Sequence, residues 1–178
     1  AWVVGAWSFV HLPFLSSLGD LAFRANLFSA VCTALAVAGT VIAGRRLNLS
    51  RSAALLAAGV VATLPAVWSL STVAEVYALN LLLLVAATLA FLRFRRNDSA
   101  VNGLFLGISA GLLLLHHQSN VLVLPLLATG VLRRPATGGT PAARRASLVA
   151  GFALGLAPGL WTPLRAALRP DLDWFGAG

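Results

Sequence analysis

The sequence predicts an all-α protein that lies in a membrane, a polytopic bundle of about six transmembrane helices. Of its 178 residues, 59% are hydrophobic and only 10% are charged. Its uncharged runs approach the roughly 20 residues that a helix needs to cross a hydrocarbon core. Its arginines are gathered into every second break between these runs, as in loops on one side of a bilayer. We therefore interpret residues 1–178 as a single transmembrane domain.

A short segment precedes the first predicted span. Residues 1–18 are apolar, but His11, Pro13 and several serines interrupt them. This pattern favours a helix in the membrane interface over a span. The segment opens within an apolar stretch, without the charged start of a signal peptide, so we interpret the chain as a fragment of a longer membrane domain.

Six apolar stretches follow within residues 22–163, each bounded by charged residues, glycine or proline, and each is predicted to be a transmembrane helix. They are Ala22–Gly44, Ala53–Leu70, Val73–Leu92, Val101–Leu115, Asn120–Leu132 and Ser147–Pro163. Asp20 directly precedes the first and is expected to cap it. The fourth and fifth are short, which favours a tilted hairpin that only just crosses the bilayer. Residues 164–178 form a tail in which Asp171 and Asp173 are expected in a turn.

The arginines predict the orientation of the chain. Ten of the thirteen lie in Arg45–Arg51, Arg93–Arg96 and Arg133–Arg145, and the other three are Arg24, Arg165 and Arg169. The positive-inside rule therefore places the arginine-rich loops in the cytoplasm. The net charge of +8 would also suit a nucleic-acid binder. The arginines abut the ends of apolar helices and form no continuous basic face, however, which excludes nucleic acid as a partner.

The breaks on the opposite, outer side carry a different set of residues, led by Glu75. The pattern places Glu75 one turn inside the third span, where an ionised group costs about 3 kcal/mol or more and tends to be paired or functional. It would act as a base, or orient an acceptor or a cation. The structural alternatives are a carboxylate favoured by the helix dipole and an ion pair with Arg24.

The break after the fourth span contains His116, His117 and Asn120. Adjacent helical residues point about 100° apart, so one histidine is expected to face a pocket and the other to act as a cap or interface residue. Neither has a partner at zinc-ligand spacing, and we predict no metal site. A hydrogen bond to a phosphate or a sugar hydroxyl suits them better. Arg24 and Arg165 would also suit a phosphate, or would only reach lipid head groups.

Two helices carry glycines at four-residue spacing, which predicts close helix packing. The stripes are Gly103, Gly107 and Gly111, and Gly151, Gly155 and Gly159. The pattern leaves open whether they face each other or form a contact between two copies of the chain.

Four motifs in order along the chain carry a family resemblance. They are Arg24–Ala30, Ala74–Leu79, the break at His117, and Pro163–Ala166 followed by Pro170 and Asp173–Trp174. Together they resemble the bacterial multi-spanning family that is related to eukaryotic transmembrane protein O-mannosyltransferases, within the GT-C superfamily of glycosyltransferases. The resemblance covers nearly the whole chain. This chain departs from the family's pattern in having His116 before His117 and Gln118 after it.

The resemblance implies an enzyme of a bacterial inner membrane. It would transfer a mannose-like sugar from a polyprenyl-phosphate donor to a protein or glycan acceptor on the extracytoplasmic face, with no other cofactor evident. It implies Glu75 and His117 as catalytic residues. Substrate-binding roles would fall to residues at the same outer breaks, namely Arg24, Asn26, Tyr77, His116, Asn120 and Arg165. The principal acidic residue of such enzymes would precede Ala1. The need for a divalent metal and the oligomeric state stay open.

Two other classes of protein compete with this interpretation. A transporter or flippase would use Glu75, His116 and His117 as a proton relay. A non-catalytic membrane assembly subunit would need little more than the glycine stripes. The polar residues cluster at one interface and leave the helix centres almost bare, which favours chemistry at a surface over passage through the bilayer.

Overall fold

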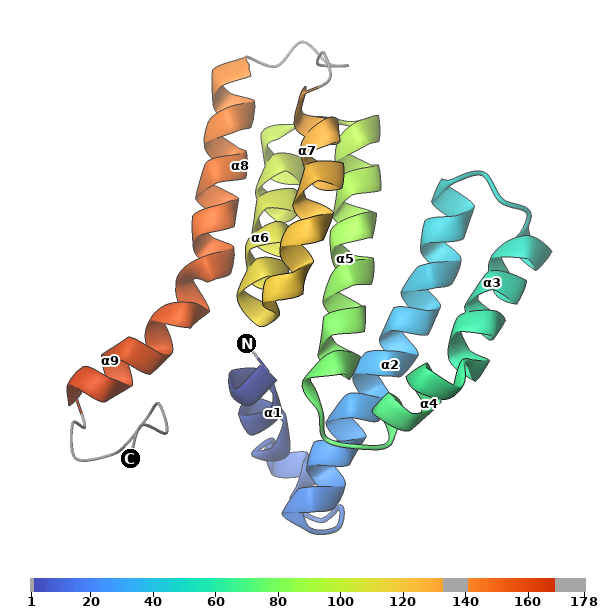
Figure 1. Ribbon diagram of the computed structural model, residues 1–178, viewed down its shortest axis with the longest axis vertical. Helices are drawn as coiled ribbons and strands as arrows, with labels where there is room; N and C mark the ends of the chain where they lie inside the picture. The colour runs from blue at the N-terminus through green and yellow to red at the C-terminus, as the bar shows by residue number, and fades with distance from the viewer. Residues whose placement is uncertain (1, 133–140, 169–178) are drawn as a thin grey trace.

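The computed structural model describes residues 2–132 and 141–168 (Figure 1). Within these ranges every element is a helix, and no strand occurs, as the sequence predicts. The α-helices are α1 Trp2–Val10, α2 Leu21–Arg46, α3 Arg51–Thr63, α4 Pro65–Ser71, α5 Val76–Arg96, α6 Ala100–His116, α7 Leu124–Leu132, α8 Pro141–Leu156 and α9 Trp161–Leu168. The 3₁₀ helices are η1 Pro13–Leu15, η2 Gln118–Val123 and η3 Ala157–Leu160.

Short polar side chains cap the starts of α2, α3 and α6. Asp20 accepts a hydrogen bond of 2.8 Å from the backbone N–H of Phe23, so the predicted cap of α2 is confirmed. Ser50 caps α3 and Ser99 caps α6 in the same way. Each cap satisfies a backbone donor that has no partner within its own helix, and so sets where the helix starts.

Two helices are long and apolar enough to cross a membrane, α2 and α5. The predicted second span is broken, because α3 and α4 meet at a bend of 65°. Pro65 starts α4 and leaves Leu64 extended, as a residue before proline prefers. If α3 and α4 are one bent span, three spans result. Ala100–His116 and Gln118–Thr129 are shorter apolar helices, so the described residues show fewer spans than the six predicted.

The two glycine stripes face each other across the interface of α6 and α8. A Cβ atom added to Gly107 would lie 2.7 Å from the backbone nitrogen of Phe152, and one added to Gly155 would lie 2.9 Å from the Cα of Gly111. The backbones therefore touch directly, which only glycine permits. The sequence left open whether the stripes pack within one chain or between two copies. The structure packs five of these glycines within one chain, namely Gly103, Gly107, Gly111, Gly151 and Gly155. Gly159 instead contacts the side chain of Leu115.

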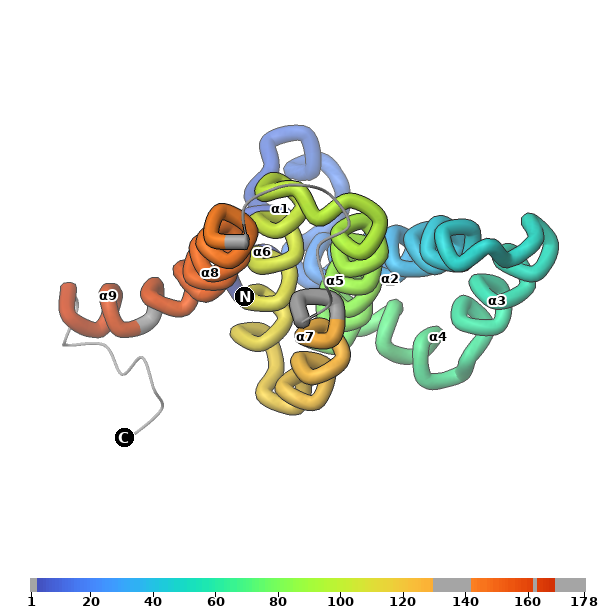
Figure 2. The backbone as a smooth tube through the Cα atoms, turned by 90° about the horizontal axis from the view of Figure 1, so that it is seen from above, coloured from blue at the N-terminus to red at the C-terminus, as the bar shows by residue number. Residues whose placement is uncertain are grey.

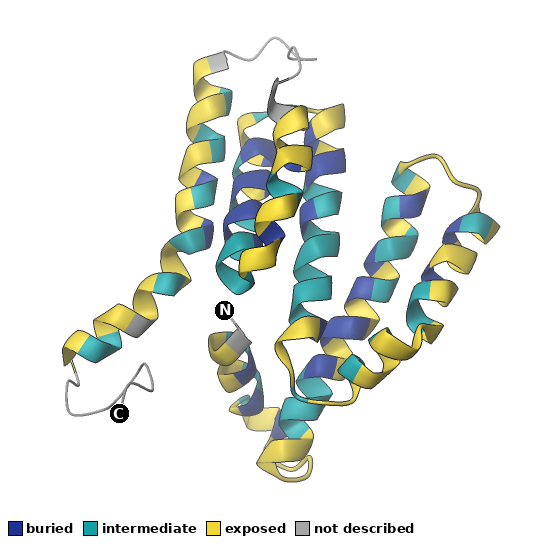
Figure 3. Cartoon of the chain, in the orientation of Figure 1, coloured by how far each residue is buried: buried dark blue, intermediate teal, exposed yellow. Residues whose placement is uncertain are grey.

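The core lies between α5, α6 and α7. Phe94, Leu106, Leu113 and Leu127 are buried there, and Figure 3 shows buried positions along the facing sides of α5 and α6. The outward faces are apolar as well. Leu56 on α3 is 71% exposed and Val149 on α8 is 69% exposed. Apolar side chains on both the inner and the outer faces are typical of helices that lie in lipid.

The arginine-rich segments gather at one end of the molecule. The last residues of α2 and α5 and the first residues of α8 lie at the top of Figure 1. Arg96 donates a hydrogen bond to the carbonyl oxygen of Arg46, and Arg144 lies 3.8 Å from the carboxylate of Asp98. The start of α5 and the end of α6 lie lower in Figure 1, away from these arginine-rich segments. The arginine-rich segments are thus separated in the fold from the segments that carry Glu75 and His117.

Candidate active site

Glu75 lies just outside α5, which corrects the predicted position one turn inside a span. The helix starts at Val76, and Glu75 occupies its N-cap position with an extended backbone. Its side chain makes no capping hydrogen bond, and the residue is exposed. No ion pair joins it to Arg24 in the part of the chain that the structure describes. The carboxylate is therefore accessible at the N-terminal end of α5.

His116 joins the end of α6 to the start of α5. Its Nε2 lies 2.8 Å from the carbonyl oxygen of Val76. Because a carbonyl oxygen only accepts, Nε2 carries the proton and donates it. Nδ1 is buried and has no hydrogen-bond partner among the described residues. The hydrogen-bonding proton of a neutral His116 is thus used to hold two helices together.

His117 is held in a different way. It ends α6 and precedes η2, and its Nδ1 accepts a hydrogen bond of 3.3 Å from the backbone N–H of Ser119. Nδ1 also lies 2.7 Å from the hydroxyl oxygen of Ser119. A neutral ring that accepts at Nδ1 carries its proton on Nε2. His116 thus links two helices, whereas His117 can donate a hydrogen bond from Nε2 to a ligand.

Tyr77 lies beside His117, in the first turn of α5. The centroids of the two rings are 6.1 Å apart, and Tyr77 is 47% exposed. The ring therefore covers one side of His117 and limits the directions from which a ligand can approach it. The start of α5 supplies a carboxylate and a phenol, and the end of α6 places the His117 imidazole beside the phenol.

Asn120 is buried and has a structural role. Its amide nitrogen donates to the side-chain oxygen of Asn80 and to the carbonyl oxygen of Leu113, each at 2.7 Å. It thereby ties η2 to both α5 and α6. A polar group buried here without partners would cost free energy, so these bonds fix the local packing.

Asn80 was not predicted as a site residue. It lies three positions after Tyr77, and residues at this spacing share a helix face, which is the signal that would have found it. Because its oxygen accepts from Asn120, its amide N–H groups point elsewhere. Asn80 also lines a cavity of about 210 Å³ between α2, α4 and α5, together with Thr33 and Tyr77. Figure 2 shows α4 beside the start of α5, where this cavity lies.

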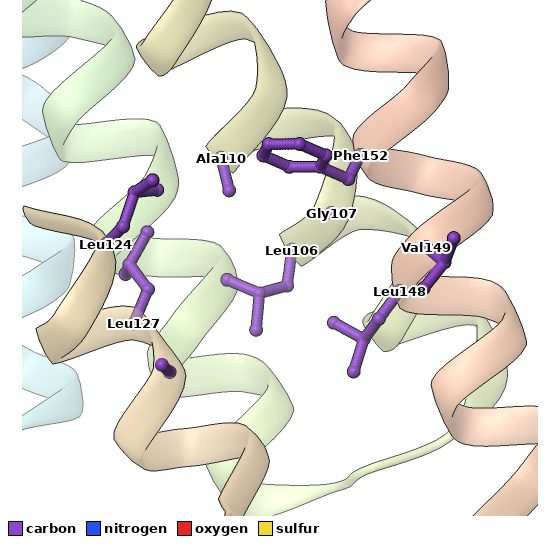
Figure 4. Close-up of a pocket in the computed structure, with 9 residues that line it drawn as sticks. Leu106, Gly107, Ala110, Leu124, Leu127, Leu148, Val149 and Phe152 are labelled. Carbon is purple, nitrogen blue, oxygen red and sulfur yellow. The ribbon is translucent and has the colours of Figure 1, made fainter. Parts of the chain in front are cut away.

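A second cavity, of about 250 Å³, lies between α6, α7 and α8. Figure 4 shows only apolar side chains directed into it, among them Leu106, Leu127 and Phe152. It offers no side-chain group for acid-base chemistry or for a hydrogen bond, and it is therefore not a candidate active site.

Arg24 connects the first two α-helices. Its guanidinium donates to the carbonyl oxygens of Val10, at 2.9 Å, and of Asp20, at 3.3 Å. These bonds give it a structural role in holding α1 against α2. Asn26 follows on α2 and is partly buried.

Arg165 lies on α9, and its guanidinium is 5.3 Å from the ring centroid of Trp161. Figures 1 and 2 both show α9 on the far side of α8 from α5. The fold thus does not bring Arg165 to the group formed by Glu75, Tyr77 and His117. Asp171, Asp173 and Arg169 lie outside the described residues. Pro170, Trp174 and Arg133 also lie outside them. Within the described ranges, no group of three potential metal ligands occurs.

Residues 2–140 match the model of a sequence family described as the protein O-mannosyl-transferase TMEM260 N-terminal domain. The chain belongs to this family. No curated protein and no solved structure matches it. Membership relates the chain to mannosyltransferases, agrees with the resemblance seen in its motifs, and fits the two apolar helices that could span a membrane.

The matched region contains most of the candidate site. Glu75, Tyr77 and His117 lie within residues 2–140, as do Arg24 and Asn120. Arg165 and the whole of α8 lie beyond it. The region matched by the family therefore includes α5 and α6, whose ends carry Glu75, Tyr77 and His117.

Proposed function

We propose that this chain forms part of a membrane glycosyltransferase of the GT-C type. It transfers a mannose-like sugar from a polyprenyl-phosphate donor to a protein or glycan acceptor at the extracytoplasmic face. The observation that carries this proposal is the group of Glu75, Tyr77 and His117 at the end of the molecule opposite the arginines, in a chain of a protein O-mannosyl-transferase family.

The chemistry requires a base for the acceptor hydroxyl and a donor of hydrogen bonds to the departing phosphate. Among the described carboxylates, Asp20 caps α2 and Asp98 pairs with Arg144, so Glu75 is the one available at this end. Glu75 orients the acceptor and takes part in removing its proton. His117 donates its Nε2 proton to the phosphate as negative charge grows there.

The remaining predicted residues have supporting roles in this proposal. Tyr77 and Asn120 shape the site around His117, and His116 holds the end of α6 against α5. Asn26 is a further substrate-binding residue, and Arg24 and Arg165 would attract the phosphate of an anionic lipid to this surface.

The arrangement in the membrane is also part of the proposal. The six apolar stretches of the sequence cross a bacterial inner membrane. Two of them do so as α2 and α5, and the others as shorter or broken helices. The arginine-rich end faces the cytoplasm, as the positive-inside rule requires. The breaks between the shorter helices leave non-helical backbone at the outer end. Such backbone needs contact with water, as does a site that admits both a lipid and an acceptor.

The relay that a transporter would need is not supported by the hydrogen bonds. His116 binds the Val76 carbonyl and His117 binds Ser119, so within the described ranges the histidines are not linked to each other or to Glu75. An assembly subunit without activity would have no need for an accessible carboxylate and imidazole at one end.

The test is transfer from a radiolabelled polyprenyl-phosphate mannose in proteoliposomes that contain the full-length protein. Glu75→Gln keeps the size of the side chain but removes its charge. We expect transfer to fall about 100-fold, within the usual range for a group in acid-base catalysis. Expression and the thermal midpoint serve as controls and should not change. Normal transfer by Glu75→Gln would show that Glu75 is structural and would remove the main support for the proposal.

A further inference from the structure

Two hydroxyl groups on α2 lack the partner that such groups normally find inside a helix. In apolar helices, Ser and Thr usually donate to the carbonyl oxygen one turn earlier. Thr40 and Thr88 do so here, each at 2.9 Å. Ser29 and Thr33 make no hydrogen bond with any described residue, although Ser29 is fully buried and Thr33 is 9% exposed. They lie four residues apart and therefore share one face of α2.

Thr33 lies on the wall of the cavity between α2, α4 and α5. Tyr77 and Asn80 line the same cavity from α5. The Asn80 oxygen is occupied by Asn120, which leaves the amide N–H groups as donors, and the Tyr77 hydroxyl has no partner among the described residues. The residues that line the cavity thus include two hydroxyls and an amide whose hydrogen-bonding capacity is unused within the described part of the chain.

The rest of the wall is apolar. Leu70 of α4 and Leu81 of α5 contribute to it, so the polar groups occupy only part of the lining. The volume of about 210 Å³ is below the roughly 300–1,000 Å³ of sites for drug-sized ligands. These properties suit one pyranose ring, which has hydroxyls around its edge and a C–H face that packs on leucine.

We infer that this cavity holds the sugar ring of the lipid-linked donor, bound through Thr33, Asn80 and Tyr77. The inference rests on the proposed function and deepens it. Tyr77 belongs both to the cavity and to the contact with His117, so a sugar in the cavity has its phosphate end toward the histidine. Ser29, one turn from Thr33, extends the polar face of α2 beside the cavity.

The inference is tested by comparing two lipids on the full-length protein in nanodiscs, a polyprenyl phosphate with a mannosyl group and the same lipid without it. The measured quantity is the ratio of their dissociation constants. Thr33→Val removes one hydroxyl at constant shape, and Tyr77→Phe removes another. Each should reduce the preference for the mannosylated lipid about fivefold to tenfold, the usual effect of one lost hydrogen bond to a ligand hydroxyl. Leu70→Phe, which narrows the cavity from the short helix α4, should reduce it as well.

Thr40→Val is the matched control, because Thr40 lies on the same helix and its hydroxyl is bonded to Ala36. It should keep the wild-type ratio. A ratio that none of the three cavity variants changes would overturn the inference and would mean that the cavity holds only water. An absence of any preference in the wild-type protein would overturn it too.

Transfer of labelled mannose, measured in parallel, separates the two proposals. A preference for the mannosylated lipid that depends on Thr33, without transfer, would contradict the enzymatic proposal alone. Transfer by a wild-type protein whose lipid preference does not depend on Thr33, Tyr77 or Leu70 would contradict the assignment of the cavity alone.

Discussion

The interface of α6 with α8 and the interface of α2 with α5 are built in opposite ways. Gly107 and Gly151 bring the first pair of helices into backbone contact, and the cavity beside that pair is entirely apolar. In the second pair, Gly39 of α2 packs against the side chain of Val85 on α5, and Thr33 and Asn80 line a cavity. One half is thus tightly packed and apolar, and the other half keeps polar side chains inside the fold. Close glycine packing holds one half together, and the cavity there is lined by apolar residues, while the cavity of the other half is lined in part by polar side chains.

Substitution at the glycine interface should have the largest effect. In Gly107→Leu, the new side chain would collide with the backbone of Leu148 and Phe152, which cannot move aside as a side chain would. We expect a loss of about 3 kcal/mol or more, the upper range for overpacking, seen as loss of the folded protein in detergent. Gly59→Leu is the matched control, since a Cβ there meets no atom within 4 Å. Equal behaviour of the two variants would show that α6 and α8 do not pack in this way.

Substitutions of the two histidines should have different effects, one on sugar transfer and the other on thermal stability. We expect His117→Ala to reduce sugar transfer about 100-fold, because it removes a hydrogen-bond donor to the leaving phosphate. His116→Ala removes the link to Val76 and should instead lower the thermal midpoint. Measuring transfer and thermal unfolding on both variants checks this. The reverse pattern would assign the chemistry to His116.

The buried amide pair should have an effect of intermediate size. Asn120→Leu leaves the Asn80 oxygen and the Leu113 carbonyl without their donor, at a cost of about 2 kcal/mol. We expect a lower thermal midpoint and weaker binding of the mannosylated lipid, since Asn80 would lose its orientation. Asn97→Leu, at the arginine-rich end, offers a comparison that should not alter lipid binding. If Asn120→Leu bound the mannosylated lipid as the wild type does, Asn80 would have no part in binding the sugar.

The smallest effect is expected at Arg24. Arg24→Gln removes the bond to the Val10 carbonyl, which is worth about 1 kcal/mol. It should loosen α1 from α2, as hydrogen exchange of α1 would show, with little change in transfer. A loss of transfer as large as that of His117→Ala would mean that Arg24 acts directly on the phosphate.

Much of the fold follows from local patterns. The apolar stretches all became helices, and Asp20 caps α2 as predicted. The exact limits did not follow, because Pro65 divides one stretch and the helix after Thr72 starts only at Val76. That shift of a few residues changed Glu75 from a residue inside a span to an exposed one. Helix starts depend on which backbone groups find partners, which hydrophobicity alone does not report.

The sequence by itself determined that the chain is helical and apolar enough to lie in a membrane. These properties depend on composition and on the order of polar breaks, which need no knowledge of packing. Only the tertiary structure decided that the glycine stripes face each other, that His116 is bonded to Val76 while His117 is not, and that Thr33, Tyr77 and Asn80 line one cavity. These contacts join residues some 40 positions apart, and such pairs meet only when side chains of particular shape fix how whole helices pack.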